Sequence, residues 1–214
     1  AAPLIVAAGS QIFCQGDSVE LSISPTSGYN YQWKLNGGTI GANNHLLNAK
    51  SAGTYSLTVA NSIGCSANST NTVDISVKTK PSLPTVNLSG PTSFCQGSSV
   101  DLSVNSSAGY QYEWENNGAA ISGATSNKLT ASTSGVYAIK ITNSDNCFVR
   151  SENVTVNVLT VPSPPSISSA SAVTFCQGDS VILSVTNTPD YSYQWRLNGG
   201  SVGSNSYSYS AKTS

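Results

Sequence analysis

Apolar and polar residues alternate along most of this chain. In residues 19–23 (VELSI), 29–35 (YNYQWKL) and 55–59 (YSLTV) every second residue is apolar, which is the pattern of a β-strand with one buried face. Runs rich in glycine, asparagine and serine separate these stretches, as at residues 36–38 and 51–53, and such residues favour turns. No stretch has the spacing of an amphipathic helix. About seven short strands in about 80 residues predict an antiparallel β-sandwich.

The whole pattern is repeated along the chain. The run FCQGDSV at residues 13–19 returns as FCQGSSV at residues 94–100 and again as FCQGDSV at residues 175–181, at a spacing of 81 residues each time. The three tryptophans keep the same spacing, at Trp33, Trp114 and Trp195. A repeat of this length can bury a small core of its own. We therefore predict tandem domains whose role is structural rather than chemical.

The predicted domains are residues 1–80, residues 81–161 and residues 162–214. The third copy is incomplete, because no counterpart of residues 53–80 follows it. Two explanations stay open. Either the sequence is an excerpt of a longer protein, which we favour, or a neighbouring molecule donates the missing strands.

Composition excludes several classes of partner. Only 9% of the residues are charged and the net charge is -1, so the chain lacks the basic stripe that binding to nucleic acid requires. Anionic membrane surfaces are excluded for the same reason, and no apolar run is long enough for direct membrane insertion. A surface of serine, threonine, asparagine and glycine is common on extracellular all-β modules.

The five cysteines point to disulfides. Each complete repeat has one pair, Cys14 with Cys65 and Cys95 with Cys147, and Cys176 has a partner at the same offset only outside the chain. This arithmetic favours disulfides in an oxidising compartment over metal ligation. We therefore expect no metal and no cofactor.

Several segments resemble strands of an immunoglobulin-like domain. Residues 18–23 are similar to strand B, residues 31–33 to strand C with its buried tryptophan, and residues 51–57 to the approach to strand F with its tyrosine corner. The last match recurs at residues 134–139. The resemblance implies an all-β fold of tandem immunoglobulin-like antiparallel β-sandwiches, with these aromatic residues in the cores: Trp33, Trp114, Trp195, Tyr55 and Tyr137.

The cysteines depart from the antibody pattern. At the places on strands B and F where antibody-type domains carry their bridge, the chain has Ile23 with Leu57 and Val104 with Ile139. The displaced cysteines, the CQG opening and the GCSA close at residues 64–67 resemble the immunoglobulin-like and PKD-like repeats of large Bacteroidetes surface proteins, such as gliding-motility adhesins. That family implies export, commonly by type IX secretion, and display or release at the cell surface.

The immunoglobulin-like topology leaves the disulfide pairing open. It places the turn before strand B and the turn after strand F at opposite ends of the sandwich, and bonded Cα atoms must lie within about 7 Å. We favour pairing within each repeat, Cys14 with Cys65 and Cys95 with Cys147, because small secreted modules usually close their own loops. The alternative is a bond between Cys14 and Cys147 across the joint of the first two repeats.

The segments between the repeats contain proline. Residues 78–84 and 158–165 are short and proline-bearing, which favours extended, semi-rigid spacers. Tandem domains on such spacers predict an elongated rod.

Candidate chemistry is sparse. The only histidine is His45, and no G-x-S-x-G elbow occurs, so we predict that the chain is not an enzyme. The aromatic residues of 29–33 share one face with Leu35, which favours a core over a sugar-binding platform. Ser18 and Ser180 lie in DSV motifs that resemble Bacteroidetes O-glycosylation sites, although an aspartate that caps a turn also explains these motifs.

We therefore expect a non-catalytic structural or adhesive stalk segment of a large secreted or surface-anchored bacterial protein, which presents a distal functional domain. Its partners are the neighbouring domains of the same protein, with other surface proteins or glycans as further candidates. The first alternative is an accessory, glycan-binding region of an exported polysaccharide-degrading enzyme. The second is a self-assembling surface fibre completed by strand donation.

Overall fold

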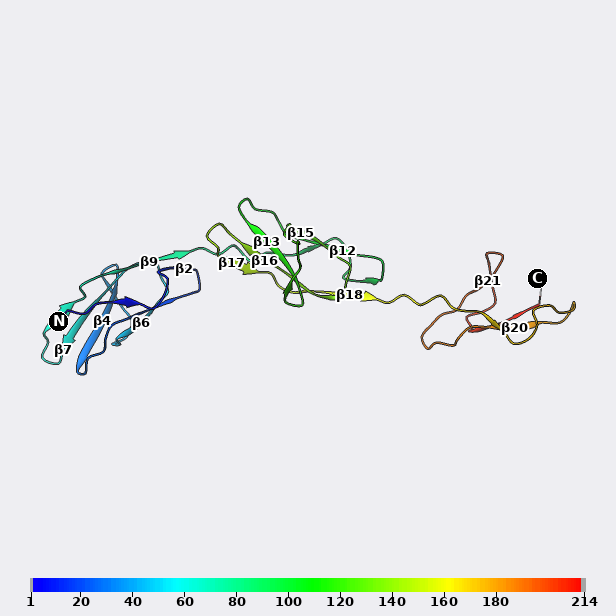
Figure 1. The fold of residues 1–214 in the computed structure, drawn as a ribbon, viewed down its shortest axis with the longest axis horizontal. Helices are drawn as coiled ribbons and strands as arrows, with labels where there is room; N and C mark the ends of the chain where they lie inside the picture. Colours follow the sequence, from blue (N-terminus) through cyan, green and yellow to red (C-terminus); the bar gives the residue numbers. More distant parts are fainter. Residues whose placement is uncertain (1, 213–214) are drawn as a thin grey trace. The chain divides into compact units, whose positions relative to one another are not determined.

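The computed structural model describes residues 2–212. Throughout this part of the chain the regular structure is β (Figure 1), and it contains no helix that is long and apolar enough to cross a membrane. The chain divides into two compact units, of which the first ends at Leu159 and the second begins at Thr160. The first two sequence repeats therefore lie in one unit.

Repeat 1 is a sandwich of two sheets. The smaller sheet has the order β1-β3-β6, and the larger has the order β2-β9-β7-β4-β5 with β8 paired to β7. All pairs are antiparallel except that of β2 with β9, which is parallel. The strands are β1 (Val6–Ala7), β2 (Ile12–Cys14), β3 (Val19–Ser22), β4 (Tyr29–Leu35), β5 (Gly38–Ile40), β6 (Leu46–Ala49), β7 (Gly53–Asn61), β8 (Ser66–Asn68) and β9 (Val73–Lys78).

Repeat 2 has the same topology. One sheet has the order β10-β12-β15, and the other has the order β11-β18-β16-β13-β14 with β17 paired to β16. The strands are β10 (Asn87–Leu88), β11 (Ser93–Cys95), β12 (Val100–Ser103), β13 (Gln111–Asn116), β14 (Ala119–Ala120), β15 (Lys128–Ala131), β16 (Gly135–Thr142), β17 (Phe148–Arg150) and β18 (Val154–Leu159).

Repeat 3, within the described residues, contains a three-stranded sheet of order β19-β20-β23 and the hairpin β21-β22. Its strands are β19 (Ser168–Ser169), β20 (Val181–Ser184), β21 (Trp195–Leu197), β22 (Gly200–Val202) and β23 (Ser208–Ala211).

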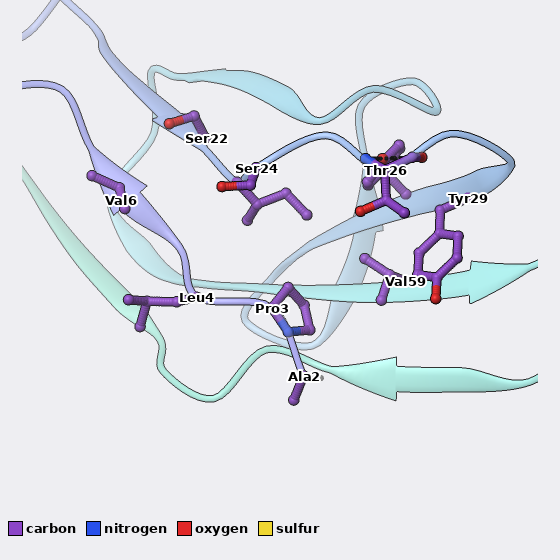
Figure 2. Close-up of a pocket in the computed structure, with 11 residues that line it drawn as sticks. Ala2, Pro3, Leu4, Val6, Ser22, Ser24, Thr26, Tyr29 and Val59 are labelled. Atoms are coloured by element: carbon purple, nitrogen blue, oxygen red, sulfur yellow. Dashed lines mark hydrogen bonds between the residues drawn. The ribbon is translucent and has the colours of Figure 1, made fainter.

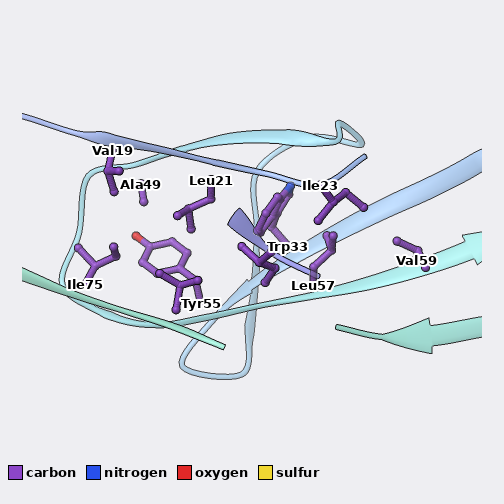
Figure 3. Packing of buried hydrophobic residues seen from close by; sticks show 11 residues of the cluster. Val19, Leu21, Ile23, Trp33, Ala49, Tyr55, Leu57, Val59 and Ile75 are labelled. Atoms are coloured by element: carbon purple, nitrogen blue, oxygen red, sulfur yellow. The ribbon is translucent and has the colours of Figure 1, made fainter. Parts of the chain in front are cut away.

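The alternating apolar residues form the cores. Trp33 is fully buried between the two sheets of repeat 1 beside Leu57 and Ile23 (Figure 3), and its indole N–H donates to the Asn44 carbonyl at 2.9 Å. Trp114 is equally buried in repeat 2, packed in one cluster with Val104 and Ile139. Trp195 is also buried. Aliphatic packing between the sheets thus stands where antibody domains place a disulfide.

Each complete repeat also has a tyrosine corner. The Tyr55 hydroxyl donates to the Ser51 carbonyl, and the Tyr137 hydroxyl donates to the Thr133 carbonyl, both at 2.9 Å. Both rings are buried. The hydrogen bond satisfies the polar end of a ring that otherwise packs in the core.

Candidate functional site

The two complete repeats are joined at the end where β9 leaves the larger sheet of repeat 1. The parallel pairing of β2 with β9 places Cys14 opposite Lys78, and the Gln15 N–H donates to the Lys78 carbonyl at 2.7 Å. We call Cys14 together with residues 78–81 the exit end of repeat 1. Its counterpart in repeat 2 is Cys95 together with Leu159, and there the Gln96 N–H donates to the Leu159 carbonyl at 2.8 Å.

A turn of repeat 2 contacts this exit end. Residues 143–147 connect β16 to β17, and the Asn143 N–H donates to the Cys147 carbonyl at 3.0 Å to close the turn. We call this segment the receiving turn of repeat 2. The corresponding residues 61–65 form the receiving turn of repeat 1, from the last residue of β7 to the residue before β8.

A disulfide between Cys14 and Cys147 links the exit end to the receiving turn, with a Cα–Cα distance of 5.6 Å. Cys147 is fully buried, although it lies on a turn. The bond is therefore part of a packed contact between the repeats and not an isolated surface link.

Asn143 contacts both sides of the joint. Its side-chain oxygen accepts the N–H groups of Asp145 and Cys147, at 3.1 and 3.0 Å, and so holds the turn in shape. Its side-chain nitrogen donates to the Thr79 carbonyl at 2.8 Å. One amide thus shapes the receiving turn and binds the exit end.

An ion pair and a proline complete the joint. Lys78 Nζ lies 3.1 Å from Asp145 Oδ1, and the two side chains are 41% and 40% exposed. A pair this exposed contributes little stability. Pro81 is buried, which fixes the start of the connection to repeat 2.

The prediction of disulfides within each repeat is wrong, and the alternative bond across the joint is the one formed. In repeat 1, Cys14 lies beside Lys78, near the start of β7, where Gly53 pairs with Ile75. Cys65 follows the far end of β7, eight residues along an extended strand, which is about 25 Å away. That separation is far beyond the reach of a disulfide.

The other cysteines have no disulfide partner among the described residues. Cys65, Cys95 and Cys176 are free and exposed. Cys95, which was predicted to pair with Cys147, lies at the exit end of repeat 2, at the end of β11 that pairs with β18.

A shallow groove lies beside the N-terminal segment of repeat 1. It has a volume of about 540 Å³, and Pro3, Thr26 and Tyr29 are among its lining residues (Figure 2). Tyr29 is 40% exposed. Grooves in the same place occur in the other repeats, with Tyr110 in repeat 2 and Tyr191 in repeat 3.

The remaining candidates are separate from the joint and from one another. His45 is half-buried and meets the edge of the Tyr31 ring at a centroid distance of 6.2 Å. Ser18 and Ser180 are exposed. Within residues 2–212, no group of three or more histidine, cysteine, aspartate or glutamate side chains is placed to hold a metal ion.

Repeat 2 carries one perturbed carboxylate. Lys128 Nζ lies 2.8 Å from Asp101 Oδ2, and the Thr130 hydroxyl donates to Asp101 Oδ1 at 2.6 Å. The hydrogen bond from Lys128, followed by that from Thr130, lowers the pKa of Asp101. All three residues lie on the paired strands β12 and β15, so this carboxylate supports the pairing of two strands of a sheet.

The sheet topology defines the class of protein: the chain consists of tandem immunoglobulin-like β-sandwich domains. No family model and no curated protein matches it. It is similar to an I-band fragment of titin (15% identity, TM-score 0.37, covering 96% of this chain and 83% of that one). It is also similar to murine CEACAM1b, with 16% identity and a TM-score of 0.35, covering 73% of this chain and 100% of that one. A third similar structure contains fibronectin(III)-like modules of Clostridium thermocellum CbhA, with 14% identity and a TM-score of 0.34, covering 73% of this chain and 94% of that one. Similarity this low says nothing about function.

Proposed function

We propose that this chain is a non-catalytic stalk segment of a large exported bacterial surface protein, which holds a functional domain away from the cell. The observation that carries the proposal is the Cys14–Cys147 disulfide. It bonds one repeat to the next outside both hydrophobic cores. A bond in that place strengthens the connection between domains and adds no chemistry.

The disulfide changes how the chain transmits a pulling force. When the two ends of the chain are pulled, the force passes through the disulfide and bypasses the chain between the two cysteines, whose sequence separation is 133. Strands β3 to β16 lie within the bypassed segment. A load that would unravel both sandwiches in the reduced chain is therefore borne by the S–S bond in the oxidised chain.

Single-molecule force spectroscopy tests this role. The fully extended oxidised chain should be about 450 Å shorter than the reduced chain, at about 3.3–3.6 Å per residue. The variant Cys147→Ser should reach the longer extension under both conditions. Equal extension of the oxidised and reduced wild-type chains would rule out a load-bearing joint.

Cysteine usage supports export, because disulfides persist in oxidising compartments. We assign the segment to the gliding-motility adhesin type of Bacteroidetes surface protein, exported by type IX secretion, on the resemblance of its repeats.

The exposed Ser18 and Ser180 are O-glycosylation sites in this proposal. Antibody labelling of intact cells, with intact mass of the native protein, tests display and modification. Labelling only after permeabilisation would contradict display.

A second candidate function is glycan binding by the accessory region of an exported polysaccharide-degrading enzyme. The recurring groove with an exposed tyrosine favours it, because aromatic faces stack on sugar rings. Binding to a glycan array that is lost in Tyr29→Ala and Tyr191→Ala would support this function. The tryptophans do not contribute to it, because all three are buried.

A further inference from the structure

The two receiving turns have the same backbone structure, although only one is occupied. In repeat 1 the Asn61 N–H donates to the Cys65 carbonyl at 3.0 Å, and in repeat 2 the Asn143 N–H donates to the Cys147 carbonyl at 3.0 Å. Position four of each turn has a positive φ, 89° at Gly64 and 60° at Asn146. The free turn thus already has the shape of the bonded one.

The asparagine side chains show what the free turn lacks. Asn61 Oδ1 accepts the Cys65 N–H at 2.9 Å, as Asn143 Oδ1 accepts the Cys147 N–H. Asn143 also uses its nitrogen to bind the Thr79 carbonyl of an exit end. Among residues 2–212 the Asn61 side-chain nitrogen has no hydrogen-bond acceptor, so this donor is available to a partner's carbonyl.

The two positions that form the ion pair at the observed joint carry different residues in the receiving turn of repeat 1 and in the exit end of repeat 2. At the formed joint the receiving turn carries Asp145 and the exit end carries Lys78, which pair at 3.1 Å. The free receiving turn has Ile63 in place of the aspartate, and the exit end of repeat 2 has Leu159 in place of the lysine. These two residues are 82% and 54% exposed. The observed joint is therefore matched by charge, whereas the receiving turn of repeat 1 and the exit end of repeat 2 are both apolar.

We propose that residues 61–65 are the receiving turn of a second joint, and that their partner is the exit end of another immunoglobulin-like repeat with an exposed cysteine and an apolar residue in place of Lys78. The exit end of repeat 2, with Cys95 and Leu159, has this chemistry and is present in a second copy of the chain. The inference rests on the proposed function, because it extends the same joint beyond the observed pair. A contact between an exit end and a receiving turn joins two different surfaces, so it propagates from head to tail.

The covalent step is an ordinary thiol–disulfide exchange. A disulfide oxidant such as oxidised glutathione first forms a mixed disulfide with Cys95 and releases one reduced glutathione. The Cys65 thiolate then attacks the Cys95 sulfur, forms the new S–S bond and releases the second glutathione. The two cysteines together lose two electrons and two protons, which the oxidant takes up.

The test uses the full chain as its own probe, at rising concentration in a glutathione buffer. Free thiols are alkylated and the chain is digested with trypsin without reduction. Lysine and arginine lie at positions that put the five cysteines in five different tryptic peptides. We expect the peptide with Cys65 bonded to the peptide with Cys95. Links of Cys65 to itself and of Cys95 to itself should be at least about tenfold rarer.

Matched variants test the apolar contact separately from the sulfur chemistry. Ile63→Asp should reduce the Cys65–Cys95 link about tenfold, because it places an unpaired charge against Leu159; a tenfold change corresponds to 1.4 kcal/mol. The double variant Ile63→Asp, Leu159→Lys reproduces the pair of the formed joint and should restore the link. Ser62→Asp adds a charge at the neighbouring exposed position and should change the yield less than about twofold.

The same digest separates the two possible failures. If the Cys14–Cys147 peptide is present and symmetric links equal the mixed link, or no link forms, the second joint is wrong and the proposed function stands. Failure of the double variant to restore the link would also overturn the proposed match. Absence of the Cys14–Cys147 peptide would overturn the proposed function itself.

Discussion

The receiving turns of repeat 1 and repeat 2 are closed by the same backbone hydrogen bonds and have different surroundings. Cys147 is fully buried and bonded, whereas Cys65 is exposed and free. Local sequence therefore builds the turn, and contact with an exit end buries it. The joint is a separate structural feature added to two complete sandwiches.

The largest expected effect comes from removing the disulfide between the exit end of repeat 1 and the receiving turn of repeat 2. Cys147→Ser should reduce the free energy of unfolding of the first unit by about 5 kcal/mol, because the bond closes a loop with a sequence separation of 133. Cys65→Ser, the matched control, should change it by less than about 0.5 kcal/mol. Denaturant unfolding without reductant measures both. Equal effects of the two variants would mean that the turns do not differ as described.

Core truncation should act on both repeats alike. Trp33→Ala and Trp114→Ala each remove a fully buried indole and should each destabilise their own repeat by about 3–5 kcal/mol. Hydrogen exchange in β7 and β16 reports the two repeats separately. Loss of protection in both strands from either variant would show that the cores are coupled through the joint. An unchanged unfolding transition would mean that the tryptophan is not in the core.

Removing the asparagine amides compares a receiving turn that binds an exit end with one that does not. Asn61→Ala removes one bond within its turn, and Asn143→Ala removes two such bonds and the bond to the Thr79 carbonyl. The second variant should be more destabilising by about 1 kcal/mol. Urea unfolding of the oxidised chain measures the difference. Equal costs would mean that the contact with Thr79 and the additional bond from the Asp145 N–H together contribute nothing.

The smallest effect is a pH dependence carried by repeat 2. The hydrogen bonds from Lys128 and Thr130 lower the pKa of Asp101 in the folded state. A lowered folded-state pKa stabilises the fold above the unfolded value of about 4, and this stabilisation is lost as the pH falls through the folded-state value. The melting temperature of Asp101→Asn should therefore fall less between pH 5 and pH 2, values chosen to bracket about 4. The same acid-induced decrease in both proteins would contradict this role.

The sandwich and its core could be predicted from the sequence, because alternation and turn residues act locally. Trp33, with Tyr31 and Leu35, marks the core face of β4, but the prediction was wrong for Tyr29, which is 40% exposed. The pairing of Cys14 could not be settled in this way. It depends on which end of the sandwich each cysteine occupies, and this follows from the parallel pairing of β2 with β9.

The polar contacts of the joint were not predicted. Asparagine is common in turns, so Asn61 and Asn143 did not stand out. The signal that could have found them is their shared place four residues before a cysteine. Lys78 and Asp145 are 67 residues apart in sequence, and nothing local relates one to the other before the repeats are joined.

The most direct test of the joint is the disulfide map of the native protein. After alkylation of free thiols, tryptic digestion without reduction separates Cys14 in residues 1–34, Cys65 in residues 51–78 and Cys147 in residues 141–150. A bonded peptide pair of residues 1–34 with residues 141–150 is the predicted result. A bonded pair of residues 1–34 with residues 51–78 would place the disulfide within repeat 1 and contradict the joint.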